Sequence, residues 1–362
     1  MPLQPLALKN YELTDRVYPQ SPHSFRTEFM RDRDRIVHSQ AFRRMEYKTQ
    51  VLMNLVGDNF RTRLTHSLEV SQISRTLARV LELNEDYSET IALGHDMGHT
   101  PFGHLGEKVL RKLTKKHGGN GFEHNQQTLR IVEKLESRYP QHPGLNLTKA
   151  TRIGLNKHIK VQGAYTHPLE SSLVNTCDEM AYLNHDTDDG LETKLLDPEQ
   201  LQELGLWREF WKKALKNFPD TSVAVLARYT IRNMINHLAE DLVKRSIENI
   251  SNSGVRTFNE LMLYQQNMEN QVLIGYSPGI KLELAAMKKF HFQNLYNHPK
   301  VLAQNKQSEE AMEKVFYWYY EDPARLSPKY KKDEINENHL QAICDCIASK
   351  TDRKIYQLAN SI

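Results

Sequence analysis

Cysteine is scarce in this sequence: Cys177, Cys344 and Cys346 are its three cysteines in 362 residues. A number this small, and odd, excludes a disulfide framework and favours a reducing compartment. Cys344 and Cys346 stand two apart, a poor spacing for a zinc motif, so we expect both to be ordinary helix residues. Apolar runs long enough to cross a membrane are absent, as is a signal-peptide pattern at the N-terminus. These absences predict a cytoplasmic protein with no membrane partner.

Strand patterns, internal repeats and low-complexity linkers are missing as well. Apolar residues instead recur at helical spacing through most of the chain. The expected helices are 65–84 (with Thr65 as its N-cap), 85–99, 102–119, 121–139, one beginning near Thr148, 169–190, 198–218, 222–250 and 309–323. A short hairpin is conceivable only at "HIKVQGAY" (158–165). The sequence therefore predicts an all-α protein, long enough to bury a large core.

A strong charge of one sign is also lacking, because 48 Lys and Arg face 45 Asp and Glu. The basic residues nevertheless gather in "RDRDRIVHSQAFRRMEYK" (31–48), followed by Arg61 and Arg63. One interpretation is a solvated helix face paired internally with Asp32 and Asp34. The other is a surface that meets phosphates, since arginine offers a rigid fork of donors. Charge alone favours the first interpretation.

Several ionisable side chains share helix faces with apolar residues. His66 lies on one stripe with Val70, Ile73 and Leu77, and a single histidine there is more often a core residue than a ligand. His124 and Asp178 repeat the pattern, and Tyr182 and Asp186 extend the stripe of Asp178. Burying a carboxylate is costly unless it is paired or bound to metal. Inward-facing groups on different helices therefore predict one shared site.

The stretch "ALGHDMGHTPFGHLGE" (92–107) is rich in such groups. His95 and Asp96, together with His66 and Asp178, would form a nitrogen and oxygen set suited to Mn²⁺, Fe²⁺, Zn²⁺ or Mg²⁺. His104 and Glu107 stand three apart on an expected helix, where a carboxylate can orient an imidazole for proton transfer. A surface pair on a charged helix would look the same.

Six blocks in order resemble the HD-domain deoxynucleoside triphosphate triphosphohydrolases, the dGTPase-like group. They are "RDRDRIVHSQAFRRMEYKTQV", "GDNFRTRLTHSLEVSQI", "LGHDMGHTPFGHLGE", "GFEHNQQTLRIVE", "DEMAYLNHDTDDG" and "SKTDRKIYQL". The resemblance implies a helical HD core with C-terminal helical additions. Its expected parts are a basic N-terminal segment (1–60), the HD core (61–200) and a C-terminal region (201–362) that completes the same large domain.

The resemblance also implies a reaction, in which water attacks the α-phosphorus of a dNTP and yields deoxynucleoside and inorganic triphosphate. It assigns one residue set to each task. The metal ligands are His66, His95, Asp96 and Asp178. The proton-transfer pair is His104 and Glu107, with His124 beside the scissile phosphate. The substrate contacts are His99 in the pocket, Arg63 on phosphate, Gln50 and Asp186 at the 3′-hydroxyl, and Tyr182 against the 2′ position.

The implied cofactor is a divalent metal ion, with Mg²⁺ or Mn²⁺ expected first and Fe²⁺, Zn²⁺, Ni²⁺ or Co²⁺ as alternatives. The implied partners are the dNTP substrate and further copies of the chain, as a hexamer or tetramer; several members of the group also take a dNTP at an activating site. Two other functions stay open: an HD hydrolase for monophosphates or cyclic nucleotides, and nucleic-acid binding through the basic N-terminal segment.

Overall fold

The protein is described by a computed structural model that covers residues 3–50, 60–156, 167–267, 272–330 and 339–362. These residues form helices joined by turns, and within them the pairing of extended chain is limited to two isolated bridges, Thr49–Thr62 and Ser137–Gly144. The all-α prediction is confirmed. The hairpin considered at 158–165 falls outside the described residues. Among the helices described, none combines the length and apolar character that a bilayer-spanning segment requires.

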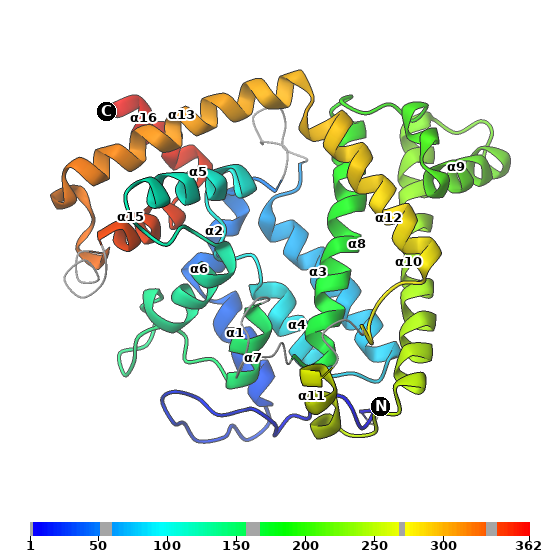
Figure 1. Cartoon of the computed structure of the whole chain (residues 1–362), viewed down its shortest axis with the longest axis horizontal. Helices are drawn as coiled ribbons and strands as arrows, with labels where there is room; N and C mark the ends of the chain where they lie inside the picture. Colours follow the sequence, from blue (N-terminus) through cyan, green and yellow to red (C-terminus); the bar gives the residue numbers. More distant parts are fainter. Residues whose placement is uncertain (1–2, 51–59, 157–166, 268–271, 331–338) are drawn as a thin grey trace. The chain divides into compact units, whose positions relative to one another are not determined.

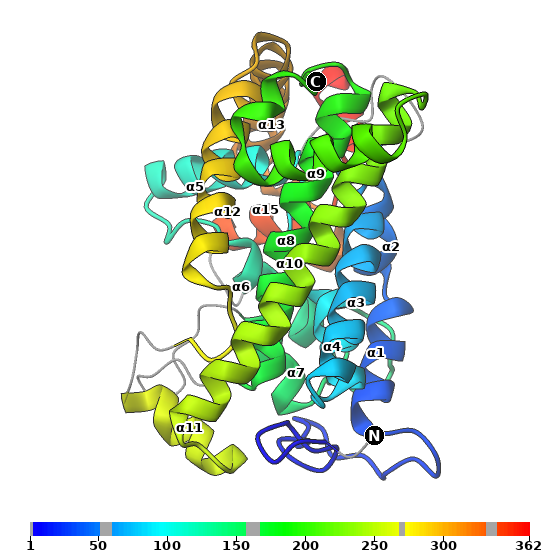
Figure 2. The ribbon, with the colours of Figure 1, turned by 90° about the vertical axis from the view of Figure 1, so that its right-hand side faces the viewer.

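The chain forms two compact units. The first comprises residues 1–9, 69–92 and 159–302, and the second comprises 10–68, 93–158 and 303–362. In the first unit, α8 lies beside both α10 and α12, and α9 packs against α10 (Figures 1 and 2). Its elements are most of α3 (Arg63–Val80) and α4 (Glu85–Gly94), then α8 (Leu169–Glu192), η3 (Gln200–Glu203), α9 (Gly205–Asn217), α10 (Val223–Ser253), α11 (Phe258–Asn267), α12 (Pro278–His291) and η4 (Phe292–Tyr296).

The second unit contains the N-terminal helices, the histidine-rich stretch and the C-terminal helices. Here α6 packs on α7, and Lys112 of α5 lies 3.2 Å from Glu313 of α13. Its elements are α1 (Glu28–Val37), α2 (Gln40–Arg44), η1 (Met45–Tyr47), α5 (Gly103–Lys116), α6 (His124–Arg130), η2 (Ile131–Leu135), α7 (Lys149–Leu155), most of α13 (Pro299–Glu321), η5 (Pro323–Arg325), α15 (His339–Ala348) and α16 (Asp352–Ser361).

Most expected helices are present, although several of their ends differ, and two of these differences lie near the histidine-rich stretch. α3 begins at Arg63, and Thr62 rather than Thr65 caps it: the Thr62 hydroxyl accepts from the Thr65 N–H at 3.3 Å, while the Thr62 N–H donates to Thr65 Oγ1 at 2.9 Å. This reciprocal pair satisfies two backbone donors at the helix start. The expected helix 85–99 ends at Gly94, so His95 and Asp96 lie in the following turn.

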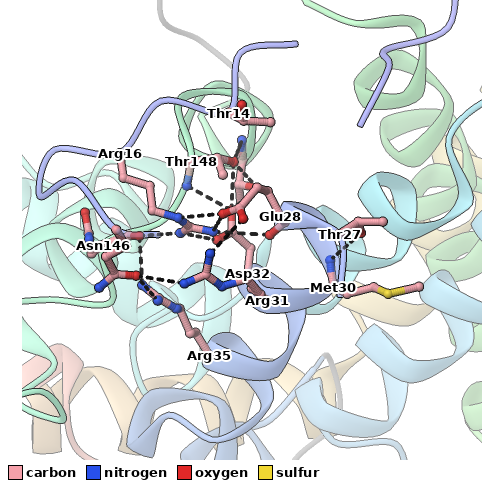
Figure 3. Close-up of polar contacts among 12 residues, drawn as sticks. Thr14, Arg16, Thr27, Glu28, Met30, Arg31, Asp32, Arg35, Asn146 and Thr148 are labelled. Atoms are coloured by element: carbon pink, nitrogen blue, oxygen red, sulfur yellow. Dashed lines mark hydrogen bonds and ion pairs between the residues drawn. The ribbon is translucent and has the colours of Figure 1, made fainter. Parts of the chain in front are cut away.

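The basic N-terminal segment is paired mainly within the second unit (Figure 3). Arg16 reaches Glu28 and Asp32, each at 2.6 Å, and Arg35 donates to the carbonyl oxygens of Leu145 and Asn146. Arg31 pairs with Glu28 at 2.7 Å. These contacts support the interpretation of Arg31 and Arg35 as structural residues, joining α1 to the chain before α7.

Candidate active site

The start of α3 places Arg63 and His66 in the interior of the second unit. Arg63 has 1% of its surface exposed, and His66 and Val70 have none. The apolar stripe of this helix therefore faces the core, as its spacing predicts. Because Thr62 is tied to Thr49 by the isolated bridge, the helix start is also held against the segment that carries Gln50.

The turn after α4 brings His95 and Asp96 to the same region. Gly98 lets this turn approach α6, because a Cβ atom at position 98 would lie 2.1 Å from the carbonyl oxygen of His124. The Gly98 N–H donates to Thr128 Oγ1 at 2.9 Å. A larger residue at 98 would separate the turn from α6, so this glycine brings His95 and His124 into one neighbourhood.

His66, His95 and Asp96 form a buried group whose candidate ligand atoms all lie within 4.8 Å of one another. The rings of His66 and His95 have centroids 5.7 Å apart, and His95 Nε2 is 3.2 Å from Asp96 Oδ1. Ligand atoms about 2.1 Å from a divalent ion lie roughly 3–4 Å from one another, so small side-chain adjustments would close this group on an ion. Two imidazoles and a carboxylate suit several divalent metals. The donor set and its geometry therefore fit a metal.

Arg63 donates to the other oxygen of the same carboxylate, Asp96 Oδ2, at 2.7 Å. Burial alone would raise the pKa of Asp96, but His95, His99 and Arg63 hold it well below its usual value. The carboxylate is therefore ionised in the interior, in the state that a metal ion requires.

His99 lies between this group and the histidines of the next helices. Its Nε2 is 3.3 Å from Asp96 Oδ1, and its ring stacks on that of His124 at 3.9 Å. Burial first, and the charge of Arg63 second, lower the pKa of His99 well below its usual value. Its buried Nδ1 has no hydrogen-bond partner among the described residues. His99 is therefore a neutral imidazole with one polar atom available to a ligand.

Glu107, on the first turns of α5, lies between two histidines. Its Oε2 is 2.9 Å from His124 Nδ1 and 3.8 Å from His104 Nδ1, and Arg111 contacts its Oε1. Burial opposes ionisation of Glu107, but the contacts with His104 and His124 hold the pKa of its carboxyl well below its usual range. The spacing of His104 and Glu107 brings them onto one helix face, as expected. His124, from α6, makes the shorter contact, which the sequence did not indicate.

The histidines of this cluster differ in exposure. The side chain of His104 is 78% exposed, whereas that of His124 is 19% exposed. His104 can therefore exchange protons with solvent, while His124 and Glu107 are enclosed. His99, His104 and Glu107 also offer ligand atoms within 4.8 Å of one another.

Gln50 lies beside Arg63 at the edge of the described chain. Its carbonyl oxygen accepts from Arg63 Nη2 at 3.5 Å, and its buried side-chain Oε1 has no hydrogen-bond partner among the described residues. Gly103 sits against both, since a Cβ atom there would lie 2.5 Å from Arg63 Nη2 and 3.3 Å from the Gln50 carbonyl oxygen. The Gln50 amide oxygen is thus an acceptor that no described donor uses, and a substrate hydroxyl could donate to it.

The remaining three candidates, Asp178, Tyr182 and Asp186, lie on α8 in the first unit, four residues apart along one face. Their roles, including that of Asp178 as a ligand, stay predictions. Within this unit Asp186 is buried and accepts a hydrogen bond from the hydroxyl of Tyr296 in η4. Nothing local in the sequence pointed to Tyr296, which stands 110 positions away.

Comparison with known proteins identifies the family. The HD domain matches residues 63–160, which contain His66, His95 and Asp96, and a phosphohydrolase-associated domain matches residues 274–361. A deoxyguanosinetriphosphate triphosphohydrolase-like protein of Bordetella pertussis is 43% identical over 355 residues, covering 93% of this chain and 90% of the relative. The chain belongs to the deoxyguanosinetriphosphate triphosphohydrolase-like family.

Other members of this family match at similar length. The dGTPase-like protein of Ralstonia pickettii is 41% identical over 97% of this chain, and that of Leptospira interrogans is 38% identical over 98%. HD domains bind divalent metals, and the group of His66, His95 and Asp96 could hold one. Family and geometry together indicate a metal-dependent phosphohydrolase.

Proposed function

We propose that this protein hydrolyses dNTPs to deoxynucleoside and inorganic triphosphate. The observation that carries the proposal is the shared carboxylate of Asp96: one oxygen faces His95 and His99, and the other accepts from Arg63. A cationic donor and a candidate metal group are thereby fixed side by side. The name of the relatives, deoxyguanosinetriphosphate triphosphohydrolase-like protein, agrees with this chemistry.

His66, His95 and Asp96 would hold the divalent ion, with Asp178 proposed as the fourth ligand. Bound there, the ion would supply Lewis-acid polarisation and charge neutralisation for the phosphate chain. Mg²⁺ or Mn²⁺ is our first choice, and Fe²⁺, Zn²⁺, Ni²⁺ and Co²⁺ suit the same ligands. Arg63 would add a fixed positive charge beside the α-phosphate.

The reaction needs two proton transfers. The attacking water loses a proton as its oxygen bonds to the α-phosphorus, and the 5′-oxygen gains one as its bond to that phosphorus breaks. Glu107 lies within reach of both His104 and His124 and would orient these imidazoles for the transfers. We assign the transfer to and from water to His104, which solvent can reach, and the place beside the scissile phosphate to His124.

Substrate selection would fall to Gln50, Asp186 and Tyr182. The buried Gln50 Oε1 and the carboxylate of Asp186 would bind the 3′-hydroxyl, and Tyr182 would lie against the 2′ position. A site built to bind a hydroxyl group rejects analogues that lack it, because its buried acceptor is then left unpaired. We therefore expect 3′-deoxygenated dNTP analogues to be poor substrates.

The products decide between this proposal and its alternative, another HD-type phosphohydrolase. The chain is incubated with each dNTP and Mg²⁺ or Mn²⁺, and the products are identified by mass. Triphosphate with deoxynucleoside is the expected pair. Pyrophosphate with dNMP, or hydrolysis confined to monophosphates or cyclic nucleotides, would refute the proposal. The same assay with a second dNTP tests for an activating site, and sedimentation tests for the proposed hexamer or tetramer.

A further inference from the structure

The turn between α15 and α16 contacts two segments that lead directly into the candidate site. Asp352, the first residue of α16, uses both carboxylate oxygens. Its Oδ2 accepts from the Thr49 N–H at 2.8 Å and from the Thr49 hydroxyl at 2.5 Å, and its Oδ1 accepts from the Phe102 N–H at 2.9 Å. One side chain near the C-terminus therefore joins two segments that lie 303 and 250 positions away.

Lys48 makes a second link among the same three segments. Its side chain is buried, and Nζ donates to the carbonyl oxygens of His99 at 2.5 Å and of Ala348 at 2.8 Å. Buried polar groups need such partners to offset the loss of water. Lys48 thus ties the chain before Gln50 both to the histidine-rich turn and to the end of α15.

The turn held by Asp352 has an unusual backbone. Phe102 and Gly103 have φ angles of 60° and 56°, both in the left-handed region. For a residue with a side chain this conformation is unfavourable, and it persists only where surrounding contacts fix it. The Asp352 carboxylate holds the Phe102 N–H, and the ring of Tyr356, one turn along α16, lies 5.0 Å from that of Phe102.

Both residues that Asp352 contacts, Thr49 and Phe102, lie shortly before candidate site residues in the sequence. Thr49 is followed by Gln50, and Phe102 stands two residues before His104 and five before Glu107 at the start of α5. A shift of either segment would move these side chains relative to Arg63, against which Gly103 is closely packed. The block "SKTDRKIYQL" (349–358), which received no role from the sequence, contains this contact.

We propose that Asp352 is a positioning residue of the active site, fixing the Gln50 segment and the start of the Glu107 helix through its two oxygens. The expected effect of replacing Asp352 on kinetics rests on the proposed dNTP hydrolysis. Its expected effect on the two segments can be measured without any substrate. A merely structural role would stabilise α16 and leave both segments unaffected.

The test compares Asp352→Asn with Thr351→Ala. The amide keeps one acceptor oxygen, so either the Thr49 or the Phe102 N–H loses its partner. Thr351 caps the same helix by accepting from the Lys354 N–H and forms no hydrogen bond to either segment among the described residues. Loss of such a cap destabilises the start of a helix. The two variants therefore perturb the same helix start, and only one of them releases the site segments.

Two readouts are taken on the full-length protein. In hydrogen–deuterium exchange without nucleotide, Asp352→Asn is expected to increase exchange in residues 45–50 and 101–107, and Thr351→Ala is expected to leave both unchanged. In steady-state kinetics, Asp352→Asn should lower kcat for the best dNTP by about 10- to 100-fold and raise KM, with unchanged metal content, because small displacements of reacting groups are costly. Thr351→Ala should stay within about twofold of the parent in both constants.

The outcomes separate the two proposals. Unchanged exchange in both segments of Asp352→Asn overturns the positioning role, as does an equal kinetic loss in Thr351→Ala. If no dNTP yields triphosphate with the parent protein, the proposed function fails, while the exchange experiment still decides the positioning role. Where Asp352→Asn does not accumulate as folded protein, Thr49→Val, which removes the hydroxyl contact alone, is measured in the same two ways.

Discussion

Arg63 donates from Nη1 to Asp96 Oδ2 at 2.7 Å, and the side chains of both residues are buried. The opposite oxygen of this carboxylate faces His95 and His99 at 3.2 and 3.3 Å. Arg63 therefore sets the orientation of a proposed metal ligand in addition to its own proposed contact with phosphate. Partners that orient a ligand in this way contribute to metal affinity.

Replacing Arg63 with alanine is expected to weaken metal binding, because Asp96 would lose the hydrogen bond that fixes its plane. Such losses are typically about 10- to 100-fold in affinity. Calorimetric titration with Mn²⁺ measures the change in metal affinity. The kcat/KM for dNTP should fall by a larger factor than the metal affinity, because the phosphate contact is lost as well.

The control is Arg79→Ala on the same helix, where an exposed arginine pairs with Glu85 at 2.8 Å. Exposed pairs of this kind contribute about 1 kcal/mol or less. Its metal affinity and kinetics should match those of the parent. Equal metal affinity in Arg63→Ala and the parent would show that Asp96 does not depend on this contact.

Glu107 provides a second prediction, in which a substitution lowers kcat and leaves metal binding unchanged. Glu107→Gln keeps the size of the side chain but removes the charge shared by His104 and His124. General acid–base assistance is typically worth about 10²- to 10⁴-fold, so kcat should fall within that range. Metal content, measured by mass spectrometry, should stay unchanged, because the proposed ligands are elsewhere. Loss of metal in this variant would instead place Glu107 among the ligands.

The third prediction compares His104→Ala with His124→Ala, to test the different roles proposed for these two imidazoles. The 2.9 Å contact of His124 with Glu107 is shorter than the 3.8 Å contact of His104. If His104 exchanges protons with solvent, added imidazole should partly restore His104→Ala, whose site is open, and should not restore the enclosed His124→Ala. Full activity in His104→Ala would remove it from the reaction.

The sequence was informative wherever a local rule applied. Helical spacing correctly placed His66 on the buried stripe of α3 and brought His104 and Glu107 onto one face of α5. It extended α4 through His99, because Pro101 was the first residue that clearly stops a helix. The close approach of α6 to Gly98, a tertiary contact, accompanies the turn that replaces this last helical stretch.

The contacts that the sequence did not predict join residues that lie far apart along the chain. Periodicity identifies which face of a helix is buried and leaves open what that face meets. The contacts of Asp352 with Thr49 and of Tyr296 with Asp186 join residues 303 and 110 positions apart. No spacing rule relates such residues, so only the folded chain shows that they are neighbours.

Asp32 gives a fourth prediction, on stability. Its carboxylate is fully buried and accepts from Arg16 Nη1 at 2.6 Å and from the Thr148 N–H at 2.9 Å, with further donors from the Thr148 and Thr151 hydroxyls (Figure 3). Asp32→Ala would leave the buried Arg16 without this partner. Breaking a buried pair typically costs about 3–5 kcal/mol of unfolding free energy, which urea denaturation measures.

Asp34→Ala is the matched control, two residues along the same helix. Asp34 pairs with Arg26 at 2.9 Å, and both side chains are about a third exposed. The expected cost is about 1 kcal/mol or less, as for other surface pairs. Similar losses in the two variants would mean that the network around Asp32 is no stronger than a surface contact.

The fifth prediction concerns pH and rests on Glu170 at the start of α8. Its Oε1 accepts from the N–H groups of Leu8 and Asn84, each at 3.0 Å, while its Oε2 is buried with no hydrogen-bond partner among the described residues. Burial raises the pKa of Glu170 from 4.5 to about 7. Below pH 4.5 the carboxyl is protonated in both folded and unfolded chains, and its contribution to stability is complete.

Between pH 4.5 and about 7 the unfolded chain releases this proton while the folded chain retains it. Rising pH therefore lowers the free energy of unfolding, by up to about 1.4 kcal/mol per pH unit and ~3 kcal/mol in all, and the loss ends above the folded-state pKa.

Glu170→Gln keeps an acceptor for Leu8 and Asn84 but cannot ionise, so it should gain stability relative to the parent across this window. Urea denaturation from pH 4 to 8 measures the difference, with Glu192→Gln, an exposed position on the same helix, as control. Parallel stability curves for Glu170→Gln and the parent would show that Glu170 does not remain protonated in the folded protein.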